Sequence, residues 1–356
     1  MTASDVLLAQ PHRRFNPLTS EWVLVSPQRL QRPWLGRIDR PATAAPPAYD
    51  PGCYLCPGNA RAGGQRNPDY TTTYVFTNDF PALLPEPQAV SEPPPSLLQW
   101  QPQGGTCRVV CFSPRHDLTL AELTPEAIGA VIETWCEQTV ELGRQYAWVQ
   151  VFENKGEQMG ASNPHPHGQI WASAELPTAP ALEARCQAEY HAAHGSSLLV
   201  DYAAEEGRRA ERVVEASDSW LAVVPFWAVW PFEILLMPRR SVARLPDLAP
   251  TDRADLAGIL RRILVRYDNL FEVPFPYSMG WHGAPFGRDS SGWQLHAHFY
   301  PPLLRSAEVR KFLVGYEMLA EPQRDLTAEM AAARLRDLPV LRYSDRLSNG
   351  APARGG

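Results

Sequence analysis

The chain has few cysteines, no long uninterrupted apolar run and no excess of positive charge, and each lack excludes a class of protein. Six cysteines in 356 residues are too few for a fold held together by disulfides. The longest apolar stretch, 220–237, is interrupted by Pro225, Pro231 and Glu233, so it predicts two strands and a turn rather than a membrane span. A formal net charge of -6 offers no field that attracts nucleic acid or an anionic membrane.

What is present suffices for a large folded unit. Apolar residues make up 44% of the chain and charged residues only 20%, which excludes disorder as the main state. The length predicts either one large domain or two halves that share a core. The tail 348–356 has too little apolar content to order itself, so we expect it to be disordered. The N-terminal segment places its basic residues after its apolar run, the reverse of a secretory signal, so we expect a cytoplasmic location.

The order of expected elements repeats along the chain. In the first half a strand at 106–112 precedes a helix that begins at Thr124–Pro125, a strand at 147–153, a glycine loop and a His-x-His segment. In the second half the same order starts with a strand at 233–238 and continues with a helix capped by Thr251. Such a repeat predicts a duplicated α+β fold, a mostly antiparallel sheet with helices packed on it, although chance similarity is the alternative. The buried face of the second helix is expected to contain Leu256, Ile259, Leu260, Ile263, Leu264 and Tyr267.

Two pairs of histidines end the two repeats. His165 with His167, and His296 with His298, are two residues apart in apolar, strand-like surroundings. On a strand such residues share a face at a spacing of about 7 Å, which is awkward for two ligands of one ion unless the strand bends. Each pair is therefore interpreted as two ligands or as a ligand and a nucleophile. Two structural histidines remain the alternative for either pair alone.

A Cys-x-x-Cys motif lies near the N-terminus. The two-residue spacer lets both thiolates, Cys53 and Cys56, reach one zinc ion, with His116 and His165 available as further ligands. A redox motif is the less favoured alternative, because no thioredoxin-like strand and helix follow. The other cysteines are interpreted as core residues: Cys107, Cys111, Cys136 and Cys186.

The segment 152–169 combines a strand end, a glycine loop and the first histidine pair. Its glycines, Gly156 and Gly160, let backbone amides approach an anion, and Asn154, Ser162 and Lys155 offer further donors. We interpret it as a phosphate-binding loop, with an ordinary connection as the alternative.

These motifs together resemble the galactose-1-phosphate uridylyltransferase family of the histidine-triad superfamily. The resemblance covers nearly the whole chain, through the Cys53/Cys56 motif and the segments 15–34, 75–83, 152–171, 281–286 and 294–329. It implies two histidine-triad-like halves, 1–195 and 196–347, joined in one half-barrel domain before the tail 348–356.

The resemblance also implies a reaction. Uridine monophosphate would move from UDP-glucose to His167, and then to galactose 1-phosphate. Gln169 would donate a hydrogen bond to the phosphoryl group; related hydrolases carry a third histidine at this position.

Two metal sites are implied as well. Cys53, Cys56, His116 and His165 would hold a structural zinc. Glu183, His282, His296 and His298 would hold iron or zinc. Without the resemblance, Glu183 would be interpreted as a surface residue.

The resemblance implies a homodimer whose active sites are completed across the interface. Phe76, Asn78 and Asp79 would contact the uridine and ribose, and Asn154, Gly160, Ala161 and Ser162 the phosphates. The partner subunit would supply Arg29 and Arg32 to the diphosphate, and a hexose-side segment with Lys311, Phe312, Val314, Tyr316, Glu317 and Gln323. Ala161 departs from similar members of the family, which have cysteine there.

Two other functions would use part of the same set of residues. A histidine-triad nucleotide phosphorylase or adenylyltransferase would use the same carrier with another base. A metal-stabilised nucleotide-binding protein without turnover would not need both His167 and Gln169, so their joint presence disfavours it.

Overall fold

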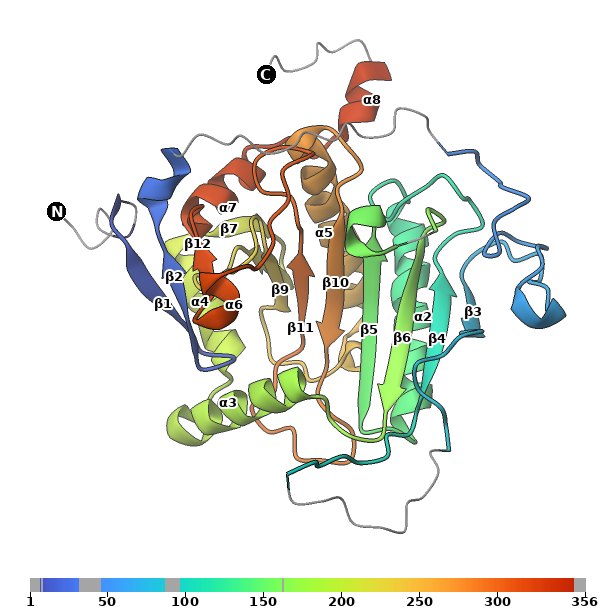
Figure 1. Ribbon diagram of the computed structural model, residues 1–356, viewed down its shortest axis with the longest axis horizontal. Helices are drawn as coiled ribbons and strands as arrows, with labels where there is room; N and C mark the ends of the chain where they lie inside the picture. The colour runs from blue at the N-terminus through green and yellow to red at the C-terminus, as the bar shows by residue number, and fades with distance from the viewer. Residues whose placement is uncertain (1–6, 8, 32–45, 87–96, 162, 349–356) are drawn as a thin grey trace.

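The computed structural model describes residues 7, 9–31, 46–86, 97–161 and 163–348. Its main element is a nine-stranded sheet, in which every strand runs antiparallel to its neighbours (Figure 1). In spatial order the strands are β3 (Tyr74–Thr77), β4 (Gly105–Cys111), β6 (His167–Ser173), β5 (Trp148–Lys155), β10 (Tyr277–His282), β11 (His296–Tyr300), β9 (Ile234–Pro238), β8 (Trp220–Val223) and β7 (Val213–Ala216).

The sheet contains the predicted repeat. In one half, β4, α2 (Pro125–Gly143), β5 and β6 follow in sequence and lie in the order β4-β6-β5; in the other, β9, α5 (Pro250–Phe271), β10 and β11 lie in the order β9-β11-β10. The two units meet where β5 pairs with β10. The prediction of an α+β fold with a large antiparallel sheet is confirmed, and so are two strands within 220–237. The division at residue 195 stays a proposal.

Helices α2 and α5 pack against each other and cover one face of the sheet. Helix α2 begins as expected, because the Thr124 hydroxyl accepts a hydrogen bond from the Ala127 amide at 3.3 Å. The cap predicted for α5 is wrong. That helix begins at Pro250 with Ala249 as N-cap, since the fixed φ of proline suits the first helical position, and Thr251 lies within the first turn. All six apolar residues predicted for its inner face are buried.

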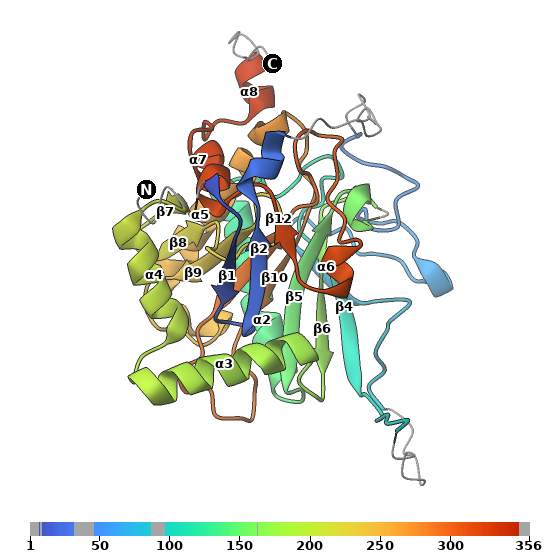
Figure 2. The ribbon, with the colours of Figure 1, turned by 60° about the vertical axis from the view of Figure 1, so that its left-hand side comes forward.

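A second, three-stranded sheet and the remaining helices surround the large sheet (Figure 2). The small sheet contains β1 (His12–Asn16), β2 (Glu21–Val25) and β12 (Gln323–Arg324). The other helices are α3 (Thr178–His194), α4 (Leu198–Arg209), α6 (Tyr316–Leu319), α7 (Ala328–Arg336) and α8 (Tyr343–Ser348), with short 3-10 turns at Pro27–Gln31, Ala62–Gly64, Glu157–Met159 and Leu245–Asp247. Ser348 thus ends a helix rather than opening a disordered tail, and 349–356 lie outside the described residues.

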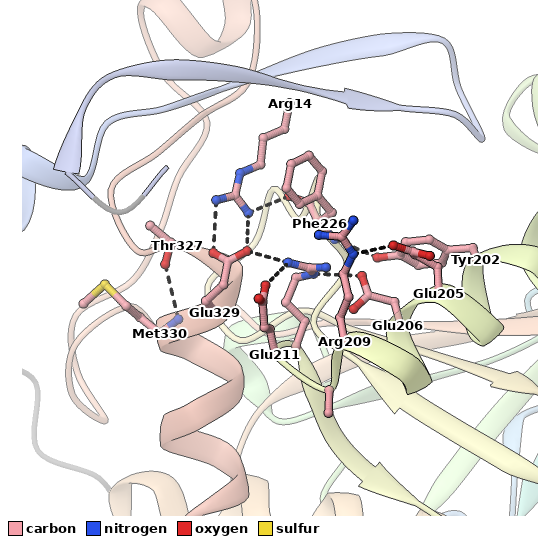
Figure 3. A network of polar contacts seen from close by, with 12 residues as sticks. Arg14, Tyr202, Glu205, Glu206, Arg209, Glu211, Phe226, Thr327, Glu329 and Met330 are labelled. Atoms are coloured by element: carbon pink, nitrogen blue, oxygen red, sulfur yellow. Dashed lines mark hydrogen bonds and ion pairs between the residues drawn. The ribbon is translucent and has the colours of Figure 1, made fainter. Parts of the chain in front are cut away.

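A largely buried network of ion pairs connects the small sheet to the rest of the protein (Figure 3). Arg14 of β1 donates to both carboxylate oxygens of Glu329 in α7, at 2.9 and 3.0 Å. Arg212 donates to Glu329 at 2.9 Å and to Glu206 at 2.8 Å. Phe226 lies beneath both guanidinium groups, 4.3 Å from that of Arg14. This bidentate and stacked arrangement joins segments from the two ends of the chain.

The structure also addresses two expectations from the sequence, those on disulfides and on membrane spans. All six cysteines are free and buried, in line with core packing for the four outside the Cys-x-x-Cys motif. None of the helices in the described part of the chain has both the length and the apolar character that a membrane crossing requires.

Glu153 on β5 makes the stability of the fold depend on pH. It is buried and accepts a hydrogen bond from the Tyr277 hydroxyl at 2.8 Å. Burial raises its pKa to about 7, an effect that the Tyr277 hydrogen bond and the nearby Lys155 only partly offset. Because the folded pKa lies above the unfolded value, the folded state binds the extra proton, and this contribution to stability is lost as pH rises to about 7.

We therefore expect Glu153→Gln, which keeps an acceptor for Tyr277 and does not titrate, to unfold less readily than the wild type at pH 8. The gain should be up to about 3 kcal/mol, and it should vanish near pH 4.5. Denaturant titrations at both pH values measure it. A difference between the two proteins that is the same at both pH values would contradict the burial argument.

Candidate active site and metal centres

Strand β6, which lies between β4 and β5, begins at His167, and this histidine lies opposite Cys111, the last residue of β4. The backbone here is tightly packed: a Cβ on Gly168 would come within 2.7 Å of the Phe112 ring and 2.9 Å of the Phe152 carbonyl oxygen. The strand-like surroundings predicted for His165 are wrong. It lies in the loop before β6, flanked by Pro164 and Pro166, which lack the amide that a strand ladder needs.

The side chain of His167 is fixed by one hydrogen bond. Its Nδ1 donates to the His165 carbonyl oxygen at 2.7 Å, so Nε2 carries the lone pair. Burial lowers the pKa of His167, although that hydrogen bond favours the charged form. The ring is therefore a neutral imidazole with its unprotonated nitrogen available to an electrophile. Gln169, two residues along, accepts from the Trp171 indole at 3.0 Å, which leaves its amide NH2 as a donor.

His167 and Gln169 line a cavity of about 410 Å³. The structure brings most of the predicted nucleotide contacts together in its wall: Phe76, Asn78, Asp79, Asn154, Gly160 and Ala161. Ser162 lies outside the described residues. The Asn154 side-chain oxygen Oδ1 accepts from the Ser278 hydroxyl at 2.7 Å, so the NH2 group remains as the donor that a ligand can use.

Lys155, proposed from the sequence as a further donor of the phosphate-binding loop, does not direct its ammonium group to a phosphate. Lys155 points to the opposite face of β5, where its ammonium lies 3.1 Å from the buried carboxylate of Asp268. Successive side chains of a strand alternate between faces, so the side chains of Asn154 and Lys155 leave β5 on opposite sides, although both residues line a small cavity of about 190 Å³ at the loop. Lys155 is a structural ion-pair partner and not a phosphate donor.

The sequence pattern does not single out Arg61, yet it also lines the cavity. Its guanidinium lies 3.8 Å from the ring centroid of Phe76 and 3.9 Å from the Asp79 carboxylate. A single arginine in a glycine-rich loop carries no periodic signal, and only its place shortly after Cys56 could have drawn attention. Further residues of the wall are Tyr54, Leu55, Ala60, Ala62, Phe80, Val109 and Gly168.

The four residues predicted as a zinc site converge beside the loop that precedes β6. Their ligand atoms lie within 4.8 Å of one another, and all four residues are buried. The Nδ1 atoms of His116 and His165 lie 3.6 and 3.5 Å from the Cys56 sulfur. His165 Nε2 donates to the Ser113 carbonyl oxygen at 2.9 Å, which leaves Nδ1 as the ligand atom.

The protonation states of this cluster fit a metal ion. Burial lowers the pKa of His165 to about 4, so its imidazole is neutral, as a ligand must be. Without a bound cation, burial raises the pKa of the Cys56 thiol to about 11. A buried thiol of this kind becomes a thiolate at neutral pH only next to a cation. Two cysteines and two histidines in a closed set are typical of structural zinc.

A second cluster lies between α3 and the β10–β11 hairpin. Glu183 of α3 lies 2.8 Å from His282 and 3.3 and 3.4 Å from the Nε2 atoms of His296 and His298. These two Nε2 atoms are buried and have no hydrogen-bond partner in the described part of the chain, as expected of metal ligands. Burial alone would raise the pKa of Glu183, but His282 and His296 hold it well below the usual value. The surface position that Glu183 would have without the family resemblance is thereby excluded.

Most residues predicted for the hexose side line a different cavity, of about 360 Å³, near the small sheet: Lys311, Phe312, Val314, Glu317 and Gln323. Arg29, predicted to contact the diphosphate, lines the same cavity. Tyr316 begins α6 and donates to Glu321 at 3.3 Å, and Arg32 lies outside the described residues. This cavity shares no residue with the one at His167. Within one chain, the two groups of predicted contacts are therefore not joined.

Comparisons with known proteins cover both halves of the chain. The family model of the galactose-1-phosphate uridyl transferase N-terminal domain matches residues 2–177, and that of the C-terminal domain matches residues 183–347. The galactose-1-phosphate uridylyltransferase of Haemophilus influenzae is 55% identical over 350 residues, which cover 97% of this chain and 99% of that protein. Its counterpart in Rattus norvegicus is 54% identical over 339 residues, 93% of this chain and 89% of that protein.

Solved structures agree with these matches. A uridylyltransferase structure superposes with a TM-score of 0.72 at 28% identity and covers 91% of this chain and 97% of that one. An Arabidopsis thaliana ADP-glucose phosphorylase shares the fold at 21% identity, with a TM-score of 0.73 over 93% of this chain and 100% of that one. On the strength of both domain models and of relatives alike over nearly their full length, the chain belongs to the galactose-1-phosphate uridylyltransferase family.

Proposed function

We propose that this enzyme of galactose metabolism transfers the uridylyl group of UDP-glucose to galactose 1-phosphate in two displacements, with His167 as the carrier. The observation that carries the proposal is the Nδ1 hydrogen bond from His167 to the His165 carbonyl, which leaves Nε2 as a nucleophile at the cavity. The nucleotidyl transfer itself follows from the family; the roles of single residues are the proposal.

In the first displacement the Nε2 lone pair of His167 attacks the α-phosphorus of UDP-glucose. A nitrogen–phosphorus bond forms, the bond to the bridging oxygen breaks, and glucose 1-phosphate leaves with the electron pair. In the second, a phosphate oxygen of galactose 1-phosphate attacks the same phosphorus, and His167 regains its lone pair. Throughout, the His165 carbonyl accepts a hydrogen bond from Nδ1–H and stabilises the positive charge on the ring.

Neutral donors surround the position of the phosphoryl group. The side-chain oxygens of Gln169 and Asn154 accept the hydrogen bonds described above. Their amide NH2 groups can therefore donate to a ligand. We assign them to the non-bridging oxygens, where they stabilise developing charge without neutralising the nucleophile. Gly160, Ala161 and Ser162 would add backbone and hydroxyl donors. Phe76, Asn78 and Asp79 would hold the uridine end.

We assign structural zinc to Cys53, Cys56, His116 and His165, and iron or zinc to Glu183, His282, His296 and His298. The first ion would brace the loop that presents His167, and neither ion takes part in a step. Because thiolate ligands need a reducing environment, we also propose a cytoplasmic location.

We further propose that the active site is completed in a homodimer. The separation of the two cavities supports this, as do exposed apolar side chains on β2, on α6 and in the segment before it, among them Trp22, Phe312, Met318 and Leu319. The partner would then bring Arg29, Arg32 and the hexose-side residues to the nucleotide.

Complementation between two inactive variants tests the dimer. His167→Gly and Lys311→Ala each disable a different half of a shared site, so a mixed dimer would contain one site in which neither change is present. We expect co-expression of the two to restore activity that neither has alone. Failure to restore activity in purified mixed dimers would show that each chain builds its own site.

Initial-rate kinetics test the order of steps. A covalent carrier predicts parallel double-reciprocal lines when UDP-glucose is varied at fixed concentrations of galactose 1-phosphate. Lines that intersect would indicate that both substrates bind before transfer, and the proposed carrier role of His167 would be wrong.

A further inference from the structure

Asn163 lies between the zinc cluster and the nucleophile, and no role has so far been assigned to it. It is buried, in the loop that leads to β6. Its Nδ2 lies 3.3 Å from the Cys53 sulfur, and its Oδ1 accepts from the His165 backbone amide at 2.9 Å. Both polar atoms of the Asn163 side chain therefore have hydrogen-bond partners.

The direction of the amide is fixed by its partners. The His165 N–H can only donate, so Oδ1 is the atom that accepts from it, and Nδ2, at 3.3 Å, is the nearer amide atom to the Cys53 sulfur, from which Oδ1 lies 3.5 Å. A metal-bound cysteine is a thiolate and can only accept. The Cys53 sulfur also lies 3.3 Å from the Leu55 backbone amide. Two N–H groups then share the charge of this thiolate.

The backbone of His165 connects this contact to the carrier. Its ring supplies Nδ1 to the metal cluster, its backbone N–H donates to Asn163, and its carbonyl accepts a hydrogen bond from Nδ1–H of His167. A shift of the His165 peptide would therefore move a metal ligand and the hydrogen bond that fixes the His167 ring. Asn163 is the side chain that ties this peptide to Cys53.

We propose that Asn163 is a positioning residue that stabilises the Cys53 thiolate and holds the His165 peptide, and so links the zinc cluster to the orientation of His167. Asn163 is not among the residues that line the 410 Å³ cavity, but it lines a smaller one, of about 190 Å³, together with His165 and His167. Outer contacts of this kind typically change metal affinity by about 10- to 100-fold.

The first test is zinc release from the intact protein to a chromogenic chelator, without substrate. Asn163→Asp keeps an acceptor for His165 but replaces the donor to Cys53 with a negative charge. We expect zinc release at least about tenfold faster than from the wild type. The matched control is Asn269→Asp, the same change at a buried asparagine whose Nδ2 donates to the Pro339 and Leu341 carbonyls, away from the cluster. It should leave the release rate unchanged.

Unchanged release from Asn163→Asp, equal acceleration in Asn269→Asp, or isolated protein without zinc would each overturn the proposal. A second measurement needs no variant. Pro164 and Pro166 lack amides and the first residue of a peptide does not retain deuterium, so a peptide that spans 163–167 reports on His165 and His167 only. Removal of zinc from the wild type should speed hydrogen exchange there at least about tenfold. Exchange that does not respond to zinc would also contradict the link.

The effect on the carrier rests on the proposed function and is measured separately. Asn163→Ala should lower the rate constant of uridylyl transfer to the protein at least about tenfold, with little change in the affinity for UDP-glucose. A loss of affinity with an unchanged rate constant would show that Asn163 acts on substrate binding. If no uridylyl-protein forms even in the wild type, the proposed carrier is wrong, whereas the zinc-release result stands by itself.

Discussion

His167→Gly should abolish transfer, with a fall in kcat of about 10⁴-fold or more. The substitution removes the atom that forms the bond to phosphorus. No other described histidine lines the cavity, so no neighbouring imidazole can replace it. The assay is release of glucose 1-phosphate from UDP-glucose in the presence of galactose 1-phosphate.

The same variant should keep its zinc and unfold close to the wild-type midpoint. His167 is only partly buried, and it is not one of the clustered ligands. Metal analysis and thermal unfolding check this, with His194→Ala, an exposed histidine on α3, as a control that should retain activity. Activity of His167→Gly within tenfold of the wild type would contradict the carrier role.

His165→Ala should have the opposite profile, with a large loss of stability together with bound zinc. The change removes one of four ligands from a closed set and leaves a buried void with the Ser113 carbonyl unpaired. Loss of a metal site belongs to the small group of changes that cost about 4 kcal/mol or more. Denaturant unfolding and metal content of the purified variant measure the two effects.

Activity should fall in His165→Ala as well, because the carbonyl that orients His167 lies on the displaced peptide. Comparison with the wild type after zinc chelation separates the two causes, since both proteins should then have similar stability. A variant that retained full zinc and the wild-type unfolding midpoint would show that His165 is not a ligand.

The local patterns of the sequence predict much of the fold. The interrupted apolar stretch predicts β8 and β9, and helical spacing predicts the inner face of α5, because these features depend on neighbours within a few residues. The error at Thr251 is also local: a proline at the first helical position outweighs a good capping side chain one residue later.

The metal clusters and the cavity depend on contacts between distant segments, which spacing alone cannot give. Cys53 and Cys56 predict half of a site, with His116 and His165 only as available partners, and Glu183 is named as a ligand by the family resemblance alone. Lys155 shows the limit of composition: a donor beside a glycine loop points away once strand alternation is known. Asn163 leaves no pattern at all, because its role rests on two contacts fixed by the fold.

The carrier role of His167 is tested best by the mass of the intact chain after incubation with UDP-glucose alone. We expect an added uridylyl group on the wild type, none on His167→Gly, and loss of the group when galactose 1-phosphate is added. Steady turnover by a wild-type protein that never gains this mass, even when the reaction is quenched within a single turnover, would contradict this role.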